Sequence, residues 1–221
     1  MMTTLNSDSN VMNTDKTNKI IESYNKNAKK FEDIFLNFEP YREKILLFQE
    51  KCLTKDKIKI LDVGCGPGNH TAYLYSLNNS YQITGIDLSD KMIELARKNA
   101  PDCHFIKGDI RNLDSNIKYD AVIASFCIVH LLNNELINFI SKLNTLLNQN
   151  GSLYLSFIEG NKAGLIKPGF LDDKVYFNFF ERAKIIKLLT GNFFKIIDLL
   201  EYDYLEENGS ASKEIFIFAQ K

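Results

Sequence analysis

Apolar residues near the N-terminus recur every three or four positions, which indicates a helix that buries one face. The positions with this spacing run from Ile20 to Phe35 and include Tyr24. A second helix is expected to follow Pro40 and to turn Phe48 inward. Residues 1–15, in contrast, are rich in Asn, Ser, Thr and Asp and hold few apolar side chains, so we expect them to form a flexible tail.

From residue 57 onward, short apolar runs alternate with helical patterns. Five such runs are typical of strands, at 58–63, 82–86, 103–107, 119–125 and 152–157. Residues 121–124 are apolar on both sides of the strand, as in a parallel sheet that helices cover on both faces. Between the second and third runs, Ser89 is a good N-cap for a helix that stops before Pro101. The alternation predicts an α/β fold with a doubly wound sheet.

The C-terminal part follows a different pattern. Two apolar runs, at 193–205 and 213–219, flank the residues Glu207, Asn208, Gly209 and Ser210. The Asn-Gly pair favours a tight turn, so an antiparallel hairpin is expected to complete a mostly parallel, seven-stranded sheet. No Pro-, Gly- or Ser-rich linker divides residues 16–221, which are therefore predicted to form one domain, with N-terminal capping helices at 16–55 and a Rossmann-like core at 56–221.

Composition narrows the class of protein. The 221 residues carry 27 basic and 28 acidic side chains, a balance that gives no general attraction for nucleic acid. No apolar run reaches the roughly 18 residues that membrane insertion requires, and residues 1–19 lack the apolar core of a signal peptide. The four cysteines have neither CxxC spacing nor a neighbouring His cluster, so we expect a reduced, cytoplasmic protein without a metal site. The sequence carries no signal for an oligomeric state.

The most informative segment is a glycine-rich loop between a strand and a helix. Its glycines, Gly64, Gly66 and Gly68, permit a tight turn and a close approach to a ligand, and the following helix offers free N–H groups. This arrangement alone indicates only a nucleotide-like ligand. However, Asn69 stands where a dinucleotide-binding loop has its third glycine. A carboxylate such as Asp62, at the end of an apolar strand, is costly without a donor or cation and suits a ligand with an ammonium group.

Two further acids follow the next two predicted strands. Asp87 ends the second strand, where a carboxylate can accept hydrogen bonds from both hydroxyls of a ribose. Asp109 follows the third strand and could accept a hydrogen bond from an exocyclic adenine amine; a simple turn-forming role is the alternative. Three acids at three successive strand ends fit the amine, ribose and adenine of one ligand.

In its glycine loop and these three acids, the chain resembles the seven-stranded, Rossmann-like (class I) S-adenosylmethionine-dependent methyltransferases of the small-molecule type. The match extends from about Tyr24 to the C-terminus. Five segments carry it: 61–68, 87–89 with Met92, 108–110, 119–125 and the final hairpin. Residues 24–31 are similar to the helix that caps the cofactor pocket in many members of this family.

The resemblance implies S-adenosylmethionine as cofactor and assigns residues to its two ends. At the methionine end, Asp62 would meet the amino group, directly or through water, and Tyr24 would close the pocket; a tyrosine at that place in a helix could equally be a core residue. The other residues implied at this end are Gly64, Cys65 and Gly66 along the backbone, with Ser125 and Phe126 as the pocket floor. At the adenosine end, Asp87 would hold the ribose and Asp109 the adenine amine, beside Leu88, Met92 and Ile110.

The implied reaction is in-line methyl transfer to a small-molecule acceptor, which requires alignment more than acid–base catalysis. His130 follows the fourth strand and is the candidate base for a hydroxyl acceptor; a structural role is the alternative. Residues 158–176 are expected to set specificity, and their apolar side chains suggest a partly hydrophobic acceptor. A nicotinamide-dependent oxidoreductase shares the sheet and Asp87, although the loop spacing and Asp62 oppose it. A non-catalytic S-adenosylmethionine-binding protein is the third reading.

Overall fold

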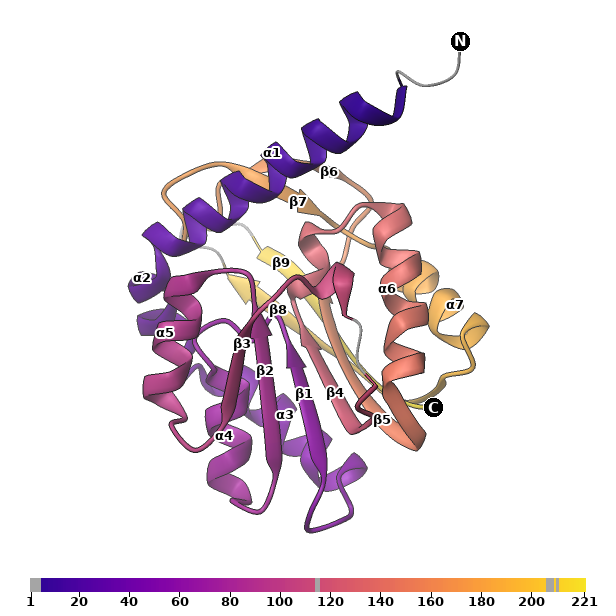
Figure 1. Cartoon of the computed structure of the whole chain (residues 1–221). Helices are drawn as coiled ribbons and strands as arrows, with labels where there is room; N and C mark the ends of the chain where they lie inside the picture. Colours follow the sequence, from indigo (N-terminus) through magenta and orange to yellow (C-terminus); the bar gives the residue numbers. More distant parts are fainter. Residues whose placement is uncertain (1–4, 114–115, 206–208, 210) are drawn as a thin grey trace.

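A seven-stranded sheet forms the centre of the computed structural model, which describes residues 5–113, 116–205, 209 and 211–221. The strands are β1 (Lys59–Val63), β2 (Gln82–Asp87), β3 (His104–Lys107), β4 (Tyr119–Ser125), β5 (Leu147–Ile158), β8 (Lys195–Leu205) and β9 (Ala211–Gln220). Their order is β3-β2-β1-β4-β5-β9-β8 (Figure 1). Within this described sheet, β9 runs opposite to the other six strands. The predicted mostly parallel sheet with an antiparallel C-terminal hairpin is confirmed; the predicted turn at Glu207, Asn208 and Ser210 lies outside the described residues.

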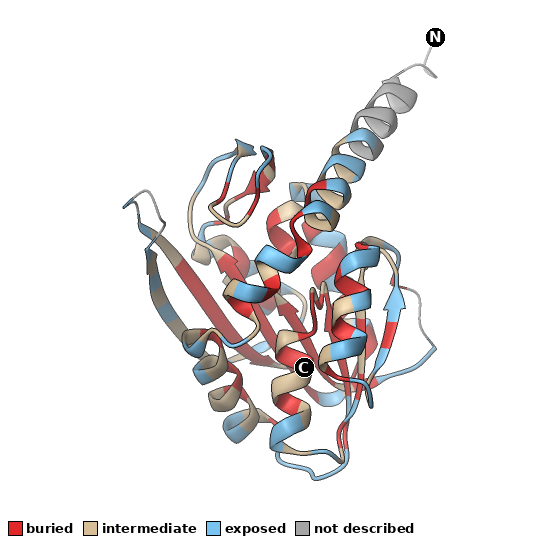
Figure 2. Cartoon of the chain, turned by 90° about the vertical axis from the view of Figure 1, so that its left-hand side faces the viewer, coloured by how far each residue is buried: buried red, intermediate tan, exposed pale blue. Residues whose placement is uncertain are grey.

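Helices cover both faces of the sheet. The helices are α1 (Leu5–Lys26), α2 (Ala28–Phe35), α3 (Glu39–Cys52), α4 (Asn69–Leu77), α5 (Asp90–Asn99), α6 (Asn133–Leu146) and α7 (Arg182–Gly191), with 3-10 turns η1 (Ile110–Asn112) and η2 (Cys127–His130). Side chains along β4 alternate between the faces: Val122 packs with α6 and α7, and Ile123 packs with α3 and α4. Figure 2 shows buried residues along the strands and exposed ones on the outer sides of the helices. No helix among the described residues is long and apolar enough to span a membrane.

The N-terminal helical segment differs from the prediction in two ways. Helix α1 begins at Leu5, so part of the predicted flexible tail is helical. The sequence analysis relied on apolar spacing, which identifies only a helix that packs one face against the protein. A helix is held by its backbone hydrogen bonds and can extend through a polar segment that has no such face. The segment is also divided at Asn27, whose side-chain nitrogen Nδ2 donates to the Ser23 carbonyl oxygen at 2.9 Å. The division into a tail and one domain stays a prediction.

A small second sheet lies beyond the carboxyl end of β5. Strands β6 (Ala163–Ile166) and β7 (Val175–Asn178) pair antiparallel within the segment that was expected to carry specificity. The sequence analysis did not predict these two strands of four residues each. Figure 1 shows the pair beside α1, above the edge of the main sheet where β1, β2 and β4 end. Helix α1 and the β6–β7 pair together lie over this edge of the sheet.

Gly85, in the middle of β2, tests how closely the sheet is packed. A Cβ atom at this position would lie 2.6 Å from the ring of Phe105, its register partner on β3, and 2.9 Å from the Cys65 sulfur. We therefore expect Gly85→Ala to lower the free energy of unfolding by about 1–3 kcal/mol through overpacking. Urea denaturation measures this change.

Gly191, at the end of α7, is the matched control, because a Cβ atom there meets nothing within 4 Å. Gly191→Ala should leave stability unchanged or raise it by a few tenths of a kcal/mol, since Ala favours helix more than Gly. Equal urea midpoints for the two variants would contradict the close packing of Gly85.

Candidate functional site

One large pocket lies at the carboxyl ends of β1, β2 and β4, under α1 and α2. Its empty volume, including open solvent at the mouth, is about 1180 Å3. All but two of the predicted site residues line it: Tyr24, Gly64, Gly66, Asp87, Leu88, Met92, Asp109, Ile110, Ser125, Phe126 and His130. The exceptions are Asp62 and Cys65. Segments more than 100 residues apart in sequence thus form a single cavity.

The glycine loop forms one wall of the pocket through its backbone. Gly64, Gly66 and Gly68 have φ values of 68°, 53° and 80°, a left-handed region that other residues rarely adopt. A Cβ atom on Gly64 would also lie 2.6 Å from the Cβ atom of Cys127. The Gly64 amide donates to the Ile86 carbonyl oxygen at 2.7 Å, so the loop is fixed against the end of β2. The predicted tight turn is confirmed, and its surface toward the pocket is bare backbone.

Asp87 is fixed at the end of β2 by two backbone donors. Its carboxylate accepts hydrogen bonds from the Gly66 amide at 3.0 Å and from the Ser89 amide at 2.8 Å. Burial raises the pKa of Asp87, and these hydrogen bonds act in the opposite direction. A carboxylate has about four lone-pair sites, so two bonds leave capacity for a ligand in the pocket. Asp87 can therefore accept further hydrogen bonds there without moving.

Asp62 lies behind the glycine loop rather than on the pocket wall. Its carboxylate is 1% exposed and accepts a hydrogen bond from the Thr71 hydroxyl at 2.8 Å. Burial raises the pKa of Asp62 to about 7, although the Thr71 hydrogen bond opposes this shift. Cys65 is buried as well, and burial raises the pKa of its thiol well above the ordinary value. The role of Asp62 toward a ligand amine and that of Cys65 along the loop stay predictions.

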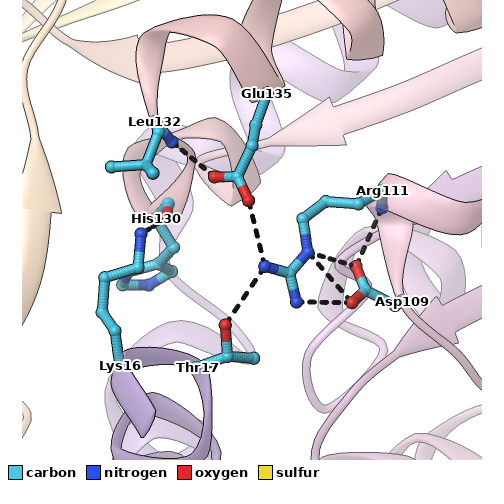
Figure 3. A network of polar contacts seen from close by, with 7 residues as sticks. All are labelled: Lys16, Thr17, Asp109, Arg111, His130, Leu132 and Glu135. Atoms are coloured by element: carbon cyan, nitrogen blue, oxygen red, sulfur yellow. Dashed lines mark hydrogen bonds and ion pairs between the residues drawn. The ribbon is translucent and has the colours of Figure 1, made fainter. Parts of the chain in front are cut away.

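Asp109 is bound on both oxygens by Arg111, a residue that the sequence analysis missed (Figure 3). Its Oδ1 accepts from the Arg111 backbone amide at 2.8 Å and from Nε at 2.9 Å, and its Oδ2 accepts from Nη2 at 2.6 Å. Arg111 Nη1 also donates to Glu135 on α6 and to the Thr17 hydroxyl on α1, both at 3.1 Å. The negative charge of Asp109 is thus compensated, and a ligand amine would share its oxygens with Arg111. The sequence did contain a signal for this ion pair, because Arg111 stands two residues after Asp109 in an expected turn.

His130 is held from both sides in one tautomer. Its Nδ1 lies 2.9 Å from the Tyr176 carbonyl oxygen, which can only accept, so Nδ1 carries the hydrogen. Its Nε2 therefore accepts from the Tyr24 hydroxyl at 3.0 Å. Burial lowers the pKa of His130 to about 4, so the ring is neutral at ordinary pH. Burial and the nearby Asp87 raise the pKa of Tyr24, which keeps its hydroxyl protonated.

Three polar side chains form hydrogen bonds at the floor of the pocket. The Ser125 hydroxyl lies 2.8 Å from His70 Nε2 and 3.0 Å from the Ser156 hydroxyl. Phe126 adopts a left-handed backbone with φ of 50°, a conformation that costs on the order of 1–3 kcal/mol for a residue other than glycine. Its amide donates to Ser156 Oγ at 3.1 Å, which helps to hold this conformation. The sequence analysis missed His70, because a histidine at the start of a helix gives no signal of its partner.

Sequence comparisons find a methyltransferase family and a methyltransferase relative for part of this chain. Residues 60–151 match the sequence model of the family described as "Methyltransferase domain". The trans-aconitate 2-methyltransferase of Escherichia coli O139:H28 is 46% identical over 66 residues, which cover 30% of this chain and 26% of that protein. The chain therefore aligns with only about a quarter of this curated relative.

Two solved structures show the same fold. The Burkholderia thailandensis 1,6-didemethyltoxoflavin-N1-methyltransferase, which holds 1,6-didemethyltoxoflavin and S-adenosylhomocysteine, has a TM-score of 0.71 at 17% identity, over 100% of this chain and 92% of that one. The [4+2]-cyclase SpnF has a TM-score of 0.67 at 18% identity, over 81% and 80%. The resemblance to class I methyltransferases that the motifs indicated is confirmed for the fold and for residues 60–151.

The buried carboxyl of Asp62 predicts a pH-dependent stability. Below pH 3.8 it is neutral in both the folded and the unfolded chain; as pH rises toward about 7, the unfolded chain ionises first, so the free energy of unfolding falls. Asp62→Asn removes this cost. The variant should gain stability over wild type between pH 4 and pH 7, by up to about 4 kcal/mol for a shift of this size.

Chemical denaturation of the ligand-free protein at a series of pH values measures this gain. Asp102→Asn, at an exposed position, is the control and should show no such increase. A gain for Asp62→Asn that stays the same at pH 4.5 and pH 8 would contradict the assigned pKa.

Proposed function

We propose that this chain, whose residues 60–151 form a methyltransferase domain, binds S-adenosylmethionine and transfers its methyl group to a small molecule. One observation carries the proposal: the bare glycine loop, Asp87 and Asp109 line one pocket at the ends of three adjacent strands. A fold of this kind binds ligands at this edge. Calorimetry tests the proposal, since S-adenosylhomocysteine should bind tightly and NAD should not. The opposite result would favour a nicotinamide-dependent oxidoreductase.

The residues of the pocket fit this cofactor. The Gly64 and Gly66 backbone lies open toward the pocket, and a side chain at Gly64 would collide with Cys127. Asp87 is already oriented and retains capacity for the two ribose hydroxyls. The apolar side chains of Leu88, Met92 and Ile110 suit a flat adenine ring. We assign Asp109 to the adenine amine, Ser125 and Phe126 to the floor, Tyr24 to the closing side and Asp62 to the methionine amine through water.

When bound, S-adenosylmethionine supplies an electrophilic methyl carbon and a sulfur leaving group. The chain then has to align an acceptor and to exclude water, and alignment alone can lower a barrier by about 7–11 kcal/mol. Helix α1 and strands β6 and β7 serve this purpose, because they lie over the strand ends (Figure 1) and contribute residues to the pocket lining. Tyr24 on α1 and Phe177 on β7 both line it.

We further propose that His130 accepts the proton that the acceptor loses. The Tyr24 hydroxyl donates to Nε2, so it can pass its own proton to His130 while it takes the proton of the acceptor. The Nδ1 hydrogen bond to the Tyr176 carbonyl oxygen stabilises the ring in the required tautomer. A neutral His130 is ready to accept at any pH well above 4. A purely structural role, in which His130 only holds Tyr24, is the alternative.

A second function has support from the likeness to SpnF. That protein is named a cyclase and shares the fold, so the fold alone does not set the reaction. A chain that binds S-adenosylmethionine without transferring its methyl group is therefore the second candidate. Formation of S-adenosylhomocysteine in the presence of candidate acceptors distinguishes the two functions. We also propose that the protein is cytoplasmic, which is consistent with the free cysteines at 52, 65, 103 and 127. Its balance of 27 basic and 28 acidic residues supports the further proposal that it has no nucleic-acid partner.

Asp87→Ala should weaken S-adenosylhomocysteine binding by on the order of 1–3 kcal/mol, because it removes hydrogen bonds to a charged acceptor. That corresponds to a rise in Kd of roughly 5- to 150-fold, measured by calorimetry. Asp87→Asn keeps the shape of the side chain and separates loss of charge from loss of the loop contact. Glu94→Ala, exposed on α5, is the control and should bind normally. An unchanged Kd for Asp87→Ala would refute the ribose assignment.

His130→Gln and Tyr24→Phe test the proton transfer. Each should lower turnover by about 100-fold or more, and the double variant should lose little beyond either single one, since the two side chains act as one unit. Cofactor affinity should stay the same for His130→Gln. Wild-type turnover should be constant from pH 8 down to about pH 5, because the pKa of His130 lies near 4. Normal turnover with a lowered melting temperature would assign His130 a structural role.

A further inference from the structure

The pocket extends beyond the assigned cofactor residues into a space walled by aromatic rings. We call Phe31, Phe35, Tyr41, Phe126 and Phe170 the aromatic chamber; all five line the pocket. The ring of Phe170 lies edge-on to those of Phe31 and Phe35, at centroid distances of 5.3 and 5.4 Å. On the other side, the rings of Tyr41 and Phe126 are 5.2 Å apart. Since Phe126 belongs to the proposed cofactor floor, the chamber is directly beside the place where a methyl acceptor would lie.

A carboxylate lies inside this aromatic surrounding. Glu214 on β9 is 4% exposed and lines the same pocket. Its Oε1 accepts a hydrogen bond from the Tyr41 hydroxyl at 2.8 Å, which orients the carboxylate. Its register partner on β5 is Ile158, another pocket residue. The sequence analysis placed Glu214 only within a predicted strand and gave it no role.

The charges of the pocket decide which acceptors it favours. Among its described lining residues, Arg111 is the one with a permanent positive charge, and it is bonded to Asp109 and Glu135 at the adenosine end. His130 is neutral, because burial lowers its pKa to about 4. Burial and the negative charge of Glu214 both raise the pKa of the Tyr41 hydroxyl, so Glu214 leaves the acceptor side negative. A carboxylate among apolar groups gains from a cation or an N–H donor, and aromatic faces attract cations, whereas an anionic acceptor would be repelled.

We propose that the methyl acceptor is a small amine, whose amino group binds to Glu214 while its carbon skeleton packs in the aromatic chamber. This inference rests on the proposed function, because it concerns the acceptor part of the same pocket. It assigns Glu214 to recognition of the acceptor and Tyr41 to orientation of the carboxylate. The same charge disfavours acidic acceptors.

The test compares matched amines and carboxylic acids on the complex with S-adenosylhomocysteine. A panel of arylalkyl amines, including 2-phenylethylamine, is titrated by calorimetry beside acids of equal size, such as 3-phenylpropanoate. The amines should bind at least tenfold more tightly than the acids. Glu214→Gln keeps the Tyr41 hydrogen bond, because the amide oxygen still accepts, yet it should remove the preference for amines. Tyr41→Phe keeps the charge of Glu214 but removes the hydrogen bond that orients it, so amines should still bind more tightly than acids, by a smaller factor than in wild type.

Glu94→Gln, exposed on α5, is the matched control and should behave as wild type. Acids that bind as well as amines, amines that do not bind the loaded protein, or an amine preference that survives in Glu214→Gln would each overturn the inference. S-adenosylhomocysteine affinity is measured first for every variant. Failure of wild type to bind that molecule would instead refute the proposed function, so the two failures are distinguishable.

Discussion

The hydrogen bonds between the glycine loop and the end of β2 are the constraint on which the site depends. Gly64 and Cys65 donate to the Ile86 carbonyl oxygen, and Gly66 donates to the Asp87 carboxylate. These bonds hold the loop in the left-handed conformations that only glycine adopts readily. The loop backbone and the Asp87 carboxylate therefore form one rigid unit, so that the pocket wall is preformed rather than assembled around a ligand.

Three ionisable side chains are enclosed around the pocket. Asp62 is enclosed behind the loop, and His70 and His130 are enclosed beneath and beside the pocket. Burial shifts all three toward their neutral forms, since it raises the pKa of the acid to about 7 and lowers those of both histidines to about 4. The acid reduces stability as pH rises from 3.8 to 7, and the histidines reduce it as pH falls from 6.5 to 4. The polar site therefore lowers the free energy of unfolding in both pH ranges, through the acid as pH rises and through the histidines as pH falls.

Local sequence signals predicted the sheet and most of the pocket, whereas contacts between distant segments remained out of reach. The apolar run of β4, the N-cap Ser89, which accepts from the Met92 amide, and the glycine loop all depend on neighbouring residues. Arg111 and Thr17 are 94 positions apart, and Tyr41 and Glu214 are 173 apart. No spacing rule links such pairs. Asp62 was found by its motif, but its orientation behind the loop depends on Thr71 of the next helix.

The contacts of α1 connect the two ends of the pocket. Thr17 receives a hydrogen bond from Arg111, which also binds the proposed adenine-binding residue Asp109. Tyr24 lies about two turns further along α1 and binds His130 at the proposed reaction end. Two residues of the pocket wall, Arg111 at one end and His130 at the other, therefore hold helix α1. Because Arg111 bonds to both Asp109 and Thr17, we expect a ligand that shares Asp109 to act on the contact that holds α1, the helix that also carries Tyr24.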